Sequence, residues 1–278
     1  MAFFNDKIVV VTGGSDGIGK ALVDALLLKG AKVATCARNL DKLYQLEKSH
    51  VGKPLITFSA DVSNEAECKN FINTVVKAYG GIDILINNAG ESSQREVNGV
   101  NWPVNAVDAV SQPLPKGRFE SITDEEWRGA LEQKLLGMIR VTRSALPLMR
   151  RAGGGSIVNV TSIKGRQPPP RLVTSGVAWA AAMNLSKGLS LELASDNIRV
   201  NVVSVGGIMT GQMEAGRRKW APEKSLEAFL APRVANIPLQ RLGTVEEVAQ
   251  AIYFLASPLS SYVTGQLLAV DGGGLRSI

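Results

Sequence analysis

A glycine-rich segment near the start of the chain has the residue types and spacing that bind phosphate groups. The sequence IVVVTGGSDGIG (8–19) is typical of an apolar strand, a tight turn and the first turn of a helix. Gly13 permits the turn, while Gly17 and Gly19 let the backbone approach a pyrophosphate and let the helix pack on the strand. Backbone N–H groups and the helix dipole would then face the phosphates. Glycines can also serve a plain turn, but a position in the first strand and crossover favours a dinucleotide site.

The residues after the second predicted strand bear on which dinucleotide is bound. A carboxylate there would bind the 2′-hydroxyl of the adenosine ribose and repel a 2′-phosphate. The sequence has CARN (36–39) instead, and the planar guanidinium of Arg38 can pair with a phosphate. Asp16, in the glycine-rich turn, argues instead for NAD(H), which lacks the 2′-phosphate. We predict NADP(H) in preference to NAD(H).

The elements that must position these residues alternate along the chain. Alternating strands and helices with short connections indicate a parallel sheet that is covered by helices on both faces. Right-handed crossovers then favour an α/β fold with a doubly wound parallel sheet, Rossmann-type, of about seven strands. Strand-like segments cover 7–12, 31–36, 54–59, 82–87, 155–161, 198–204 and 266–270, and helical patterns cover 17–29, 40–50, 63–79, 123–151, 173–195 and 244–256.

Residues 1–278 are expected to form one dinucleotide-binding domain, since 45% of the chain is hydrophobic and the length suits one large core. Two stretches interrupt the alternation. Residues 91–118 are polar and contain three prolines, which predicts an inserted loop that is either a wall of the substrate pocket or a disordered surface insertion. Residues 211–240 precede the last helix and are a candidate lid over the site.

Composition excludes several classes of function. The net charge is +6, but no basic stripe is interleaved with aromatic residues, so no nucleic-acid partner is expected. No apolar run reaches the roughly 18 residues of a membrane span, and the first residues leave no room for a signal peptide. Cys36 and Cys68 lack metal-ligand spacing and are expected to be buried free thiols, and His50 is expected to cap a helix. We therefore expect a cytoplasmic protein without a metal site or membrane partner.

Several motifs together resemble the short-chain dehydrogenase/reductase family, over nearly the whole chain except about 91–118. They are TGGSDGIG (12–19), Asp61-Val62 after the third strand, NNAG (87–90), VGGIMT (205–210), in which Val205 replaces a proline, and VTGQLLAVDGG (263–273). The resemblance implies cofactor contacts at Gly13, Ser15, Asp16, Gly17, Ile18, Gly19, Arg38, Asp61, Val62, Asn88, Ala89, Gly90, Ile208 and Thr210.

The family's catalytic positions hold unusual residues in this chain. Ser162, at the end of a predicted strand, matches the serine that hydrogen-bonds the reacting carbonyl. Counting back from IRVN (198–201), the two positions of the family's Tyr-x-x-x-Lys motif hold Ser175 and Trp179. Counting within EEWRGALEQKLLG (125–137), the family's asparagine position holds Lys134. No tyrosine between Tyr79 and Tyr253 could take over the role of proton donor.

We predict Ser162, Lys134 and Ser175 as the catalytic residues. Lys134 lies within a largely apolar helical pattern, and it could supply the cation or the proton transfer lost at Trp179. The alternative is that Lys134 is an exposed helix lysine. Lys164 is a second candidate. Ser175 carries a hydroxyl, which is a poorer acid than a phenol. Trp179 could stack on a flat substrate or pack in the core.

Three functions remain open from these residues. The first is an NAD(P)(H)-dependent oxidoreductase that acts on a carbonyl or hydroxyl of a small organic substrate. The second is a non-redox enzyme, a lyase or isomerase, on the same fold, and the third is a catalytically silent regulatory protein that binds a dinucleotide. The nucleotide motifs favour the first. The resemblance also implies a homodimer or homotetramer, formed through 123–151 and 173–195, of which the second is rich in small residues.

Overall fold

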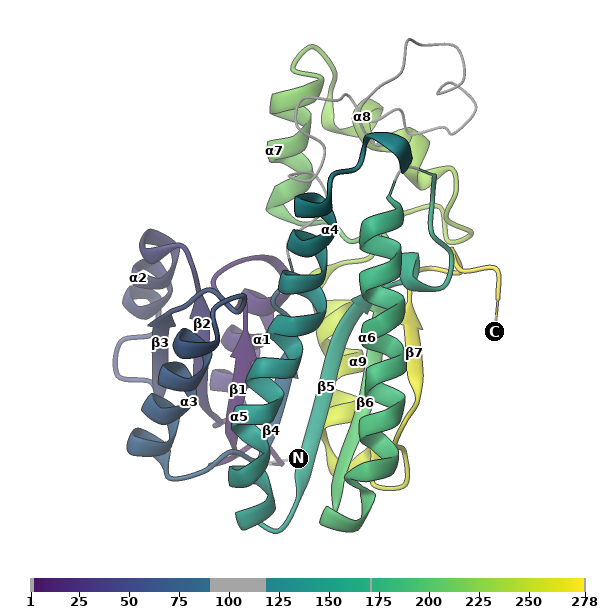
Figure 1. The fold of residues 1–278 in the computed structure, drawn as a ribbon. Coiled ribbons are helices and arrows are strands. Elements are labelled where there is room, and N and C mark those ends of the chain that lie inside the picture. The colour runs from purple at the N-terminus through teal and green to yellow at the C-terminus, as the bar shows by residue number, and fades with distance from the viewer. Residues whose placement is uncertain (1–2, 91–118, 171, 278) are drawn as a thin grey trace.

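The computed structural model describes residues 3–90, 119–170 and 172–277, and within them seven strands form one parallel sheet (Figure 1). The strand order is β3-β2-β1-β4-β5-β6-β7, so the chain changes direction across the sheet between β1 and β4. This confirms the doubly wound Rossmann-type fold. The strands are β1 (Ile8–Thr12), β2 (Lys32–Ala37), β3 (Leu55–Ser59), β4 (Ile84–Asn87), β5 (Gly155–Ser162), β6 (Ile198–Val205) and β7 (Leu267–Val270).

Helices cover both faces of the sheet (Figure 1). Alternate residues of β1 show the two sides of the core: Val9 and Val11 pack in one apolar cluster, and Val10 packs in the other. All three are fully buried, which is typical of a central parallel strand. One face carries α1 (Gly17–Leu28), α2 (Leu40–Ser49) and α9 (Val245–Ala256), and the opposite face carries α3 (Glu65–Tyr79), α5 (Gly137–Arg151) and α6 (Val173–Glu192).

The long helix predicted over 123–151 is divided into three parts. It begins as α4 (Asp124–Leu131), continues as the π-helical turn η3 (Glu132–Leu136) and ends as α5. Gly137 follows the π turn, and a Cβ there would lie 2.7 Å from Cγ2 of Val62. Glycine therefore lets the helix approach the loop that follows β3, which brings η3 to the carboxyl edge of the sheet.

The stretch 211–240 contains two helices that were not predicted. They are α7 (Gly211–Trp220) and α8 (Leu226–Val234), and they share a small apolar cluster around Leu230, Ile237 and Leu242. Arg217 fixes the turn between them, because its guanidinium pairs with Glu214 at 2.7 Å and donates to the carbonyl of Lys224 at 3.0 Å. The short 3₁₀ turns are η2 (Phe119–Ser121), η4 (Ile163–Gly165), η5 (Ala194–Asp196) and η6 (Pro258–Ser260).

The two cysteines and the histidine have structural positions. Cys36 and Cys68 are buried and free, and His50 is the C-cap of α2, as predicted. In the described part of the chain, no helix is long and apolar enough to cross a membrane, and no cluster of three or more His, Cys, Asp or Glu could hold a metal ion. The predicted inserted loop, 91–118, lies outside the described residues.

Candidate functional site

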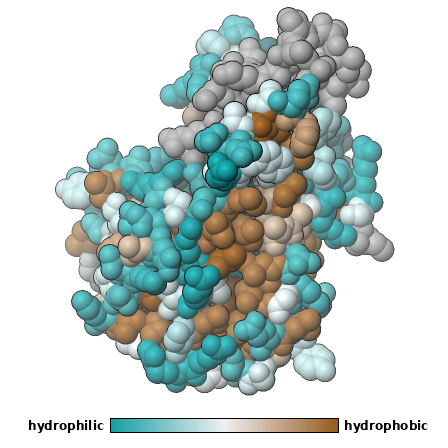
Figure 2. Space-filling view, in the orientation of Figure 1, coloured by the Kyte–Doolittle hydropathy of each residue, from teal (hydrophilic) through white to brown (hydrophobic). Residues whose placement is uncertain are grey.

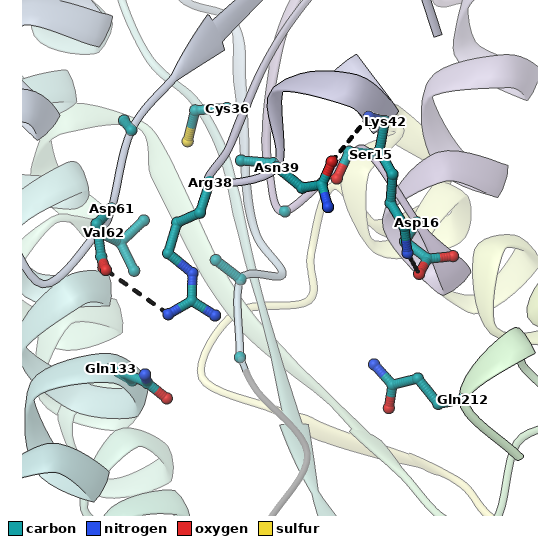
Figure 3. A pocket seen from close by; sticks show the side chains of 15 residues that line it. Ser15, Asp16, Cys36, Arg38, Asn39, Lys42, Asp61, Val62, Gln133 and Gln212 are labelled. Atoms are coloured by element: carbon teal, nitrogen blue, oxygen red, sulfur yellow. Dashed lines mark hydrogen bonds and ion pairs between the residues drawn. The ribbon is translucent and has the colours of Figure 1, made fainter. Parts of the chain in front are cut away.

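A cavity of about 490 Å³ opens at the carboxyl ends of β1 to β4 (Figure 3). In α/β sheets this edge, at the point where the strand order reverses, is where ligands bind. Its walls come from the turns after four strands, from the start of α2, from η3 and from α7. The lining residues are Gly13, Ser15, Asp16, Cys36, Ala37, Arg38, Asn39, Lys42, Ala60, Asp61, Val62, Ala89, Gly90, Gln133 and Gln212.

The glycine-rich turn can exist only with glycine at particular positions. Gly13 and Gly17 have φ values of +71° and +52°, which disfavour residues with a Cβ. A Cβ on Gly19 would lie 2.1 Å from the carbonyl oxygen of Gly13. The side chain of Asp16 accepts a hydrogen bond from the Gly17 N–H at 2.8 Å and so caps α1. The turn therefore presents bare backbone and a helix N-terminus, which suits the pyrophosphate of a dinucleotide.

Asn88 supports the cavity rather than lining it. Its side-chain amide donates to the carbonyl oxygen of Thr12 at 3.0 Å. In return, the Thr12 hydroxyl accepts from the backbone N–H groups of Asn88 and Ala89 at 3.0 and 2.9 Å. These bonds lock the turn after β4 to the turn after β1, and Ala89 and Gly90 are left at the cavity wall.

Arg38 and Asp61 form an ion pair at the end of the cavity that is lined by the turns after β2 and β3. Figure 3 shows Arg38 extending from the end of β2 toward Asp61, with the two charged groups 3.7 Å apart. Burial raises the pKa of Asp61, but hydrogen bonds from Ser63 and the positive charge of Arg38 lower it by more. The pKa of Asp61 is therefore below its usual value. Asp61 is thus an anion that holds the guanidinium at the position expected for the adenosine ribose.

Lys42, in the first turn of α2, is a lining residue that the sequence analysis did not identify. Its ammonium group pairs with the carboxylate of Asp16, and its backbone N–H donates to Asn39 Oδ1 at 2.9 Å. Burial raises the pKa of Asp16, while the hydrogen bond from Lys42 and the one from the Gly17 N–H lower it below the usual value. Asp16, which was expected to favour NAD(H), is therefore paired with a cation.

Gln133 and Gln212 lie on opposite sides of the cavity, in η3 and α7 (Figure 3). Neither was predicted, because each reaches the cavity only through the placement of its helix. Lys42 could have been found, since it follows Arg38 at the start of a predicted helix.

Lys134 is buried inside the π-helical turn. Its exposed fraction is 1%, which excludes the alternative of an exposed helix lysine. π-helical turns inside longer helices occur frequently at functional sites. Its neighbours Leu135 and Met138 pack with Trp179 of α6, so Lys134 and α6 belong to the same region of the protein.

Ser162 and Ser175 lie on elements that pack closely together beside the cavity. Ser162 is half-buried at the end of β5, and its hydroxyl accepts from the Lys164 N–H at 3.4 Å. A Cβ on Gly176 would lie 3.2 Å from the carbonyl oxygen of Lys164, so the turn after Ser162 touches the start of α6. Ser175, in that start, is fully buried. In the described part of the chain, the predicted catalytic residues Ser162, Lys134 and Ser175 are absent from the cavity lining.

Trp179 is a core residue that borders the cavity. It is 9% exposed and packs against Met138 and Ala182. A Cβ on Gly90 would lie 2.9 Å from Cη2 of its ring, so the indole contacts the backbone of the turn after β4. Tyr253 packs against Phe4 in the cluster on the opposite face of the sheet, and it is no substitute for a phenol near α6.

The remaining predicted cofactor residues are distributed around the glycine-rich turn. Thr210 is the N-cap of α7, and its Cγ2 would lie 3.7 Å from a Cβ on Gly17, which places it over that turn. Ile18 and Ile208 pack with the core, and neither belongs to the cavity lining among the described residues.

Comparison with known proteins gives matches over the full length of this fold. Residues 13–274 match the family described as enoyl-(acyl carrier protein) reductase. The chain is 35% identical to 3-oxoacyl-(acyl-carrier-protein) reductase FabG of Thermotoga maritima over 270 residues, 96% of this chain and 97% of that protein.

Two solved structures show the same similarity in three dimensions. L-sorbose reductase from Gluconobacter frateurii, complexed with NADPH and L-sorbose, is 29% identical, with a TM-score of 0.87 and 100% of both chains covered. An NADPH-bound short chain oxidoreductase from Pseudomonas aeruginosa PAO1, which contains an atypical catalytic center, is 34% identical. Its TM-score is 0.81, and the match covers 99% of this chain and 100% of that one.

Proposed function

Because the chain belongs to the short-chain dehydrogenase/reductase family, we propose that it is an NADP(H)-dependent oxidoreductase acting on a carbonyl or hydroxyl group of a small organic substrate. The observation that carries the proposal is the cavity at the carboxyl edge of the sheet, with Arg38 and no carboxylate directly after β2. The glycine-rich turn would hold the pyrophosphate, and Arg38 the 2′-phosphate. When bound, the nicotinamide supplies or accepts a hydride.

We assign the polar chemistry of the substrate site to Ser162, Lys134 and Ser175. Ser162 would orient the carbonyl oxygen through its hydroxyl, and Lys134 would supply positive charge or a proton as charge develops on that oxygen. Support comes from the burial of Lys134 in a π-helical turn, next to the residues that contact Trp179. The solved relative with an atypical catalytic center, 34% identical, gives a precedent for a non-standard set in this family.

Titration of the purified protein with NADPH and with NADH, followed by nicotinamide fluorescence, tests the cofactor assignment. We expect tighter binding of NADPH and loss of that preference in Arg38→Ala. Equal affinities in the parent protein would overturn the assignment. Turnover is then measured with a panel that includes a 3-oxoacyl thioester and L-sorbose, after the 3-oxoacyl-(acyl-carrier-protein) reductase and the L-sorbose reductase among the relatives.

Dinucleotide binding without turnover is a second candidate function, and one observation favours it. The buried indole of Trp179 occupies the space beside Gly90, where the family's lysine is expected. An indole offers one N–H donor and no charge, so it cannot replace an ammonium group. NADPH binding that is unaccompanied by oxidation of the cofactor with any substrate of the panel would support this function over the first.

We also propose that the chain forms a homodimer or homotetramer through α5 and α6. Figure 2 shows apolar residues gathered over these two helices, and Val177 and Leu191 of α6 are 44% and 70% exposed. Light scattering that gives only the 29.6 kDa monomer at micromolar concentration would refute the oligomer.

The stretch 211–240 is proposed as a lid because α7 brings Gln212 to the cavity.

A further inference from the structure

Residues 271–277 follow β7 and form a tail that turns around the carboxylate of Asp271. The two carboxylate oxygens accept hydrogen bonds from the N–H groups of Gly273 at 3.0 Å and Leu275 at 2.7 Å. Gly272 and Gly273 have φ values of +64° and +86°, which residues with a Cβ rarely adopt. The course of the tail is therefore fixed by its own residues.

The side-chain amide of Gln167 joins this tail to the loop 163–170, which follows Ser162. Its Oε1 accepts from the backbone N–H of Arg276 at 2.9 Å, and its Nε2 donates to the carbonyl of Gly274 at 3.4 Å. These two bonds, the latch, connect Gln167 to residues 109 and 107 positions away in the sequence. They bind only backbone groups of the tail, so the side chain at position 276 is not required for them.

The loop needs such a tie because three of its residues, Pro168, Pro169 and Pro170, cannot donate backbone hydrogen bonds. Its inner part is seated on α6, since a Cβ on Gly165 would lie 2.9 Å from the backbone N of Ala180. Its outer part meets the tail through the latch. The loop thus lies between α6 and the tail.

We infer that Gln167 is a positioning residue, which holds the loop after Ser162 through the latch and so sets the affinity for substrate. The inference rests on the proposed function, in which Ser162 orients the substrate carbonyl. The Ser162 hydroxyl accepts from the Lys164 N–H at 3.4 Å, so its surroundings follow the loop. If substrate binds only when the latch is closed, the observed affinity falls in proportion to the fraction of molecules with a closed latch. Among the described residues, the loop and the tail are absent from the lining of the cofactor cavity, so cofactor binding is independent of the latch.

Four variants separate the latch from general damage. Gln167→Met keeps the side-chain length and removes both bonds. Arg276→Pro removes the N–H that Gln167 binds, whereas Arg276→Ala keeps that N–H and is the matched control. Gln167→Glu retains an acceptor for the shorter bond and lacks the donor of the longer one, so its effect should lie between those of the parent and Gln167→Met.

Steady-state kinetics with a substrate from the panel measures the effect on the reaction. The KM should rise about twofold to tenfold in Gln167→Met and in Arg276→Pro, as expected for the loss of one or two hydrogen bonds that are exposed to water. The kcat should be unchanged, because saturating substrate selects the closed latch. Partial misfolding would instead lower kcat and leave KM unchanged. The Kd of NADPH should stay within about twofold, and the double variant should resemble either single variant.

Trypsin cleavage after Arg166 follows the latch without any turnover. This bond lies next to Gln167, and proteases cut segments that open locally. Arg276→Pro leaves the loop sequence unchanged, so its cleavage at this bond can be compared directly with that of the parent. We expect severalfold faster cleavage in Arg276→Pro and the parent rate in Arg276→Ala, with mass spectrometry identifying the fragment that ends at Arg166.

Parent-like KM in Gln167→Met would overturn the inference, whether or not cleavage is faster. An equal rise of KM in Arg276→Ala, or effects that add in the double variant, would also overturn it. Failure of the proposed function is distinguishable from these results. A parent protein that binds NADPH and turns over no substrate contradicts the proposed oxidoreductase, and the cleavage rates of Arg276→Pro and Arg276→Ala still decide whether the latch holds the loop.

Discussion

Replacing Gly14 with alanine should destabilise the fold through one buried side chain, Thr35. The new Cβ would lie 2.1 Å from Thr35 Oγ1 and 2.8 Å from Cγ2 of Val23. Thr35 is fully buried on β2, and its hydroxyl donates to the Val11 carbonyl at 2.7 Å and accepts from the Gly14 N–H at 3.0 Å. The hydroxyl is fixed by these two bonds, so it cannot turn away from the added methyl group.

The size of the effect follows from two opposing terms. Overpacking of a dense core costs about 1–3 kcal/mol of unfolding free energy, whereas replacing glycine gains about 0.4–1 kcal/mol from the unfolded chain. We expect a net loss of roughly 1–2 kcal/mol for Gly14→Ala. Thr35→Ala should cost about 1–3 kcal/mol, since the Gly14 N–H loses its buried partner. In the double variant the new methyl group occupies the space of the lost hydroxyl, so the combined loss should fall about 1–2 kcal/mol short of the sum.

Urea unfolding followed by circular dichroism, at one fixed protein concentration and without cofactor, measures the four free energies of this cycle. Gly129→Ala in α4 is the control, because a Cβ there meets nothing within 4 Å. Helix propensity alone should make that control more stable by about 0.5–1 kcal/mol. Losses that add to within about 0.5 kcal/mol would show that Thr35 is not the group that requires glycine at position 14.

Further predictions concern catalysis, pH and thiol reactivity. Lys134→Met should lower the turnover number of any identified substrate by about 10²–10⁴-fold, and survival within about threefold would show that Lys134 is not the acid–base group. Because the pKa of Asp61 is lowered in the folded state, its ionisation stabilises the protein above the unfolded value of about 3.9, and this contribution is lost as the pH falls through the lower folded pKa. The stability difference between the parent and Asp61→Asn should therefore shrink as the pH falls below about 4, and a difference that does not change with pH would contradict the ionisation. Burial raises the pKa of Cys36 to about 12 and that of Cys68 to about 11, so iodoacetamide at pH 8 should label both only after unfolding. Rapid labelling of the folded protein would contradict this.

The sheet could be predicted from the sequence because each of its strands is a short apolar run next to a helical pattern. The apolar side chains that pack in the core also identify the strand in the sequence, as the fully buried run Val9–Val11 illustrates. Helices α7 and α8 were not predicted, since their small cluster around Leu230 gives only a weak apolar pattern and Pro222 and Pro232 interrupt the stretch.

The π-helical turn at 132–136 could not be predicted, because a single extra residue in a turn leaves almost the same apolar pattern as an α-helix. Lys134 lies within that turn and is buried. For the cofactor, Arg38 was identified from its place after a strand, but the effect of Asp16 was judged without its partner. The pairing of Asp16 with Lys42 joins residues 26 positions apart, and only the packing of α2 beside the glycine-rich turn reveals it.

The contact between Trp179 and Gly90 gives the protein an optical probe at the wall of the cavity. Indole emission overlaps the absorption of reduced nicotinamide, and the transfer of excitation energy between them falls steeply with distance. Because the ring touches a residue of the cavity wall, a reduced dinucleotide bound in the cavity would lie well within the range of such transfer. Excitation of the indole would then produce nicotinamide emission, and Trp179→Phe would reduce it. Arrival and departure of the cofactor could be followed in the native chain without an attached dye.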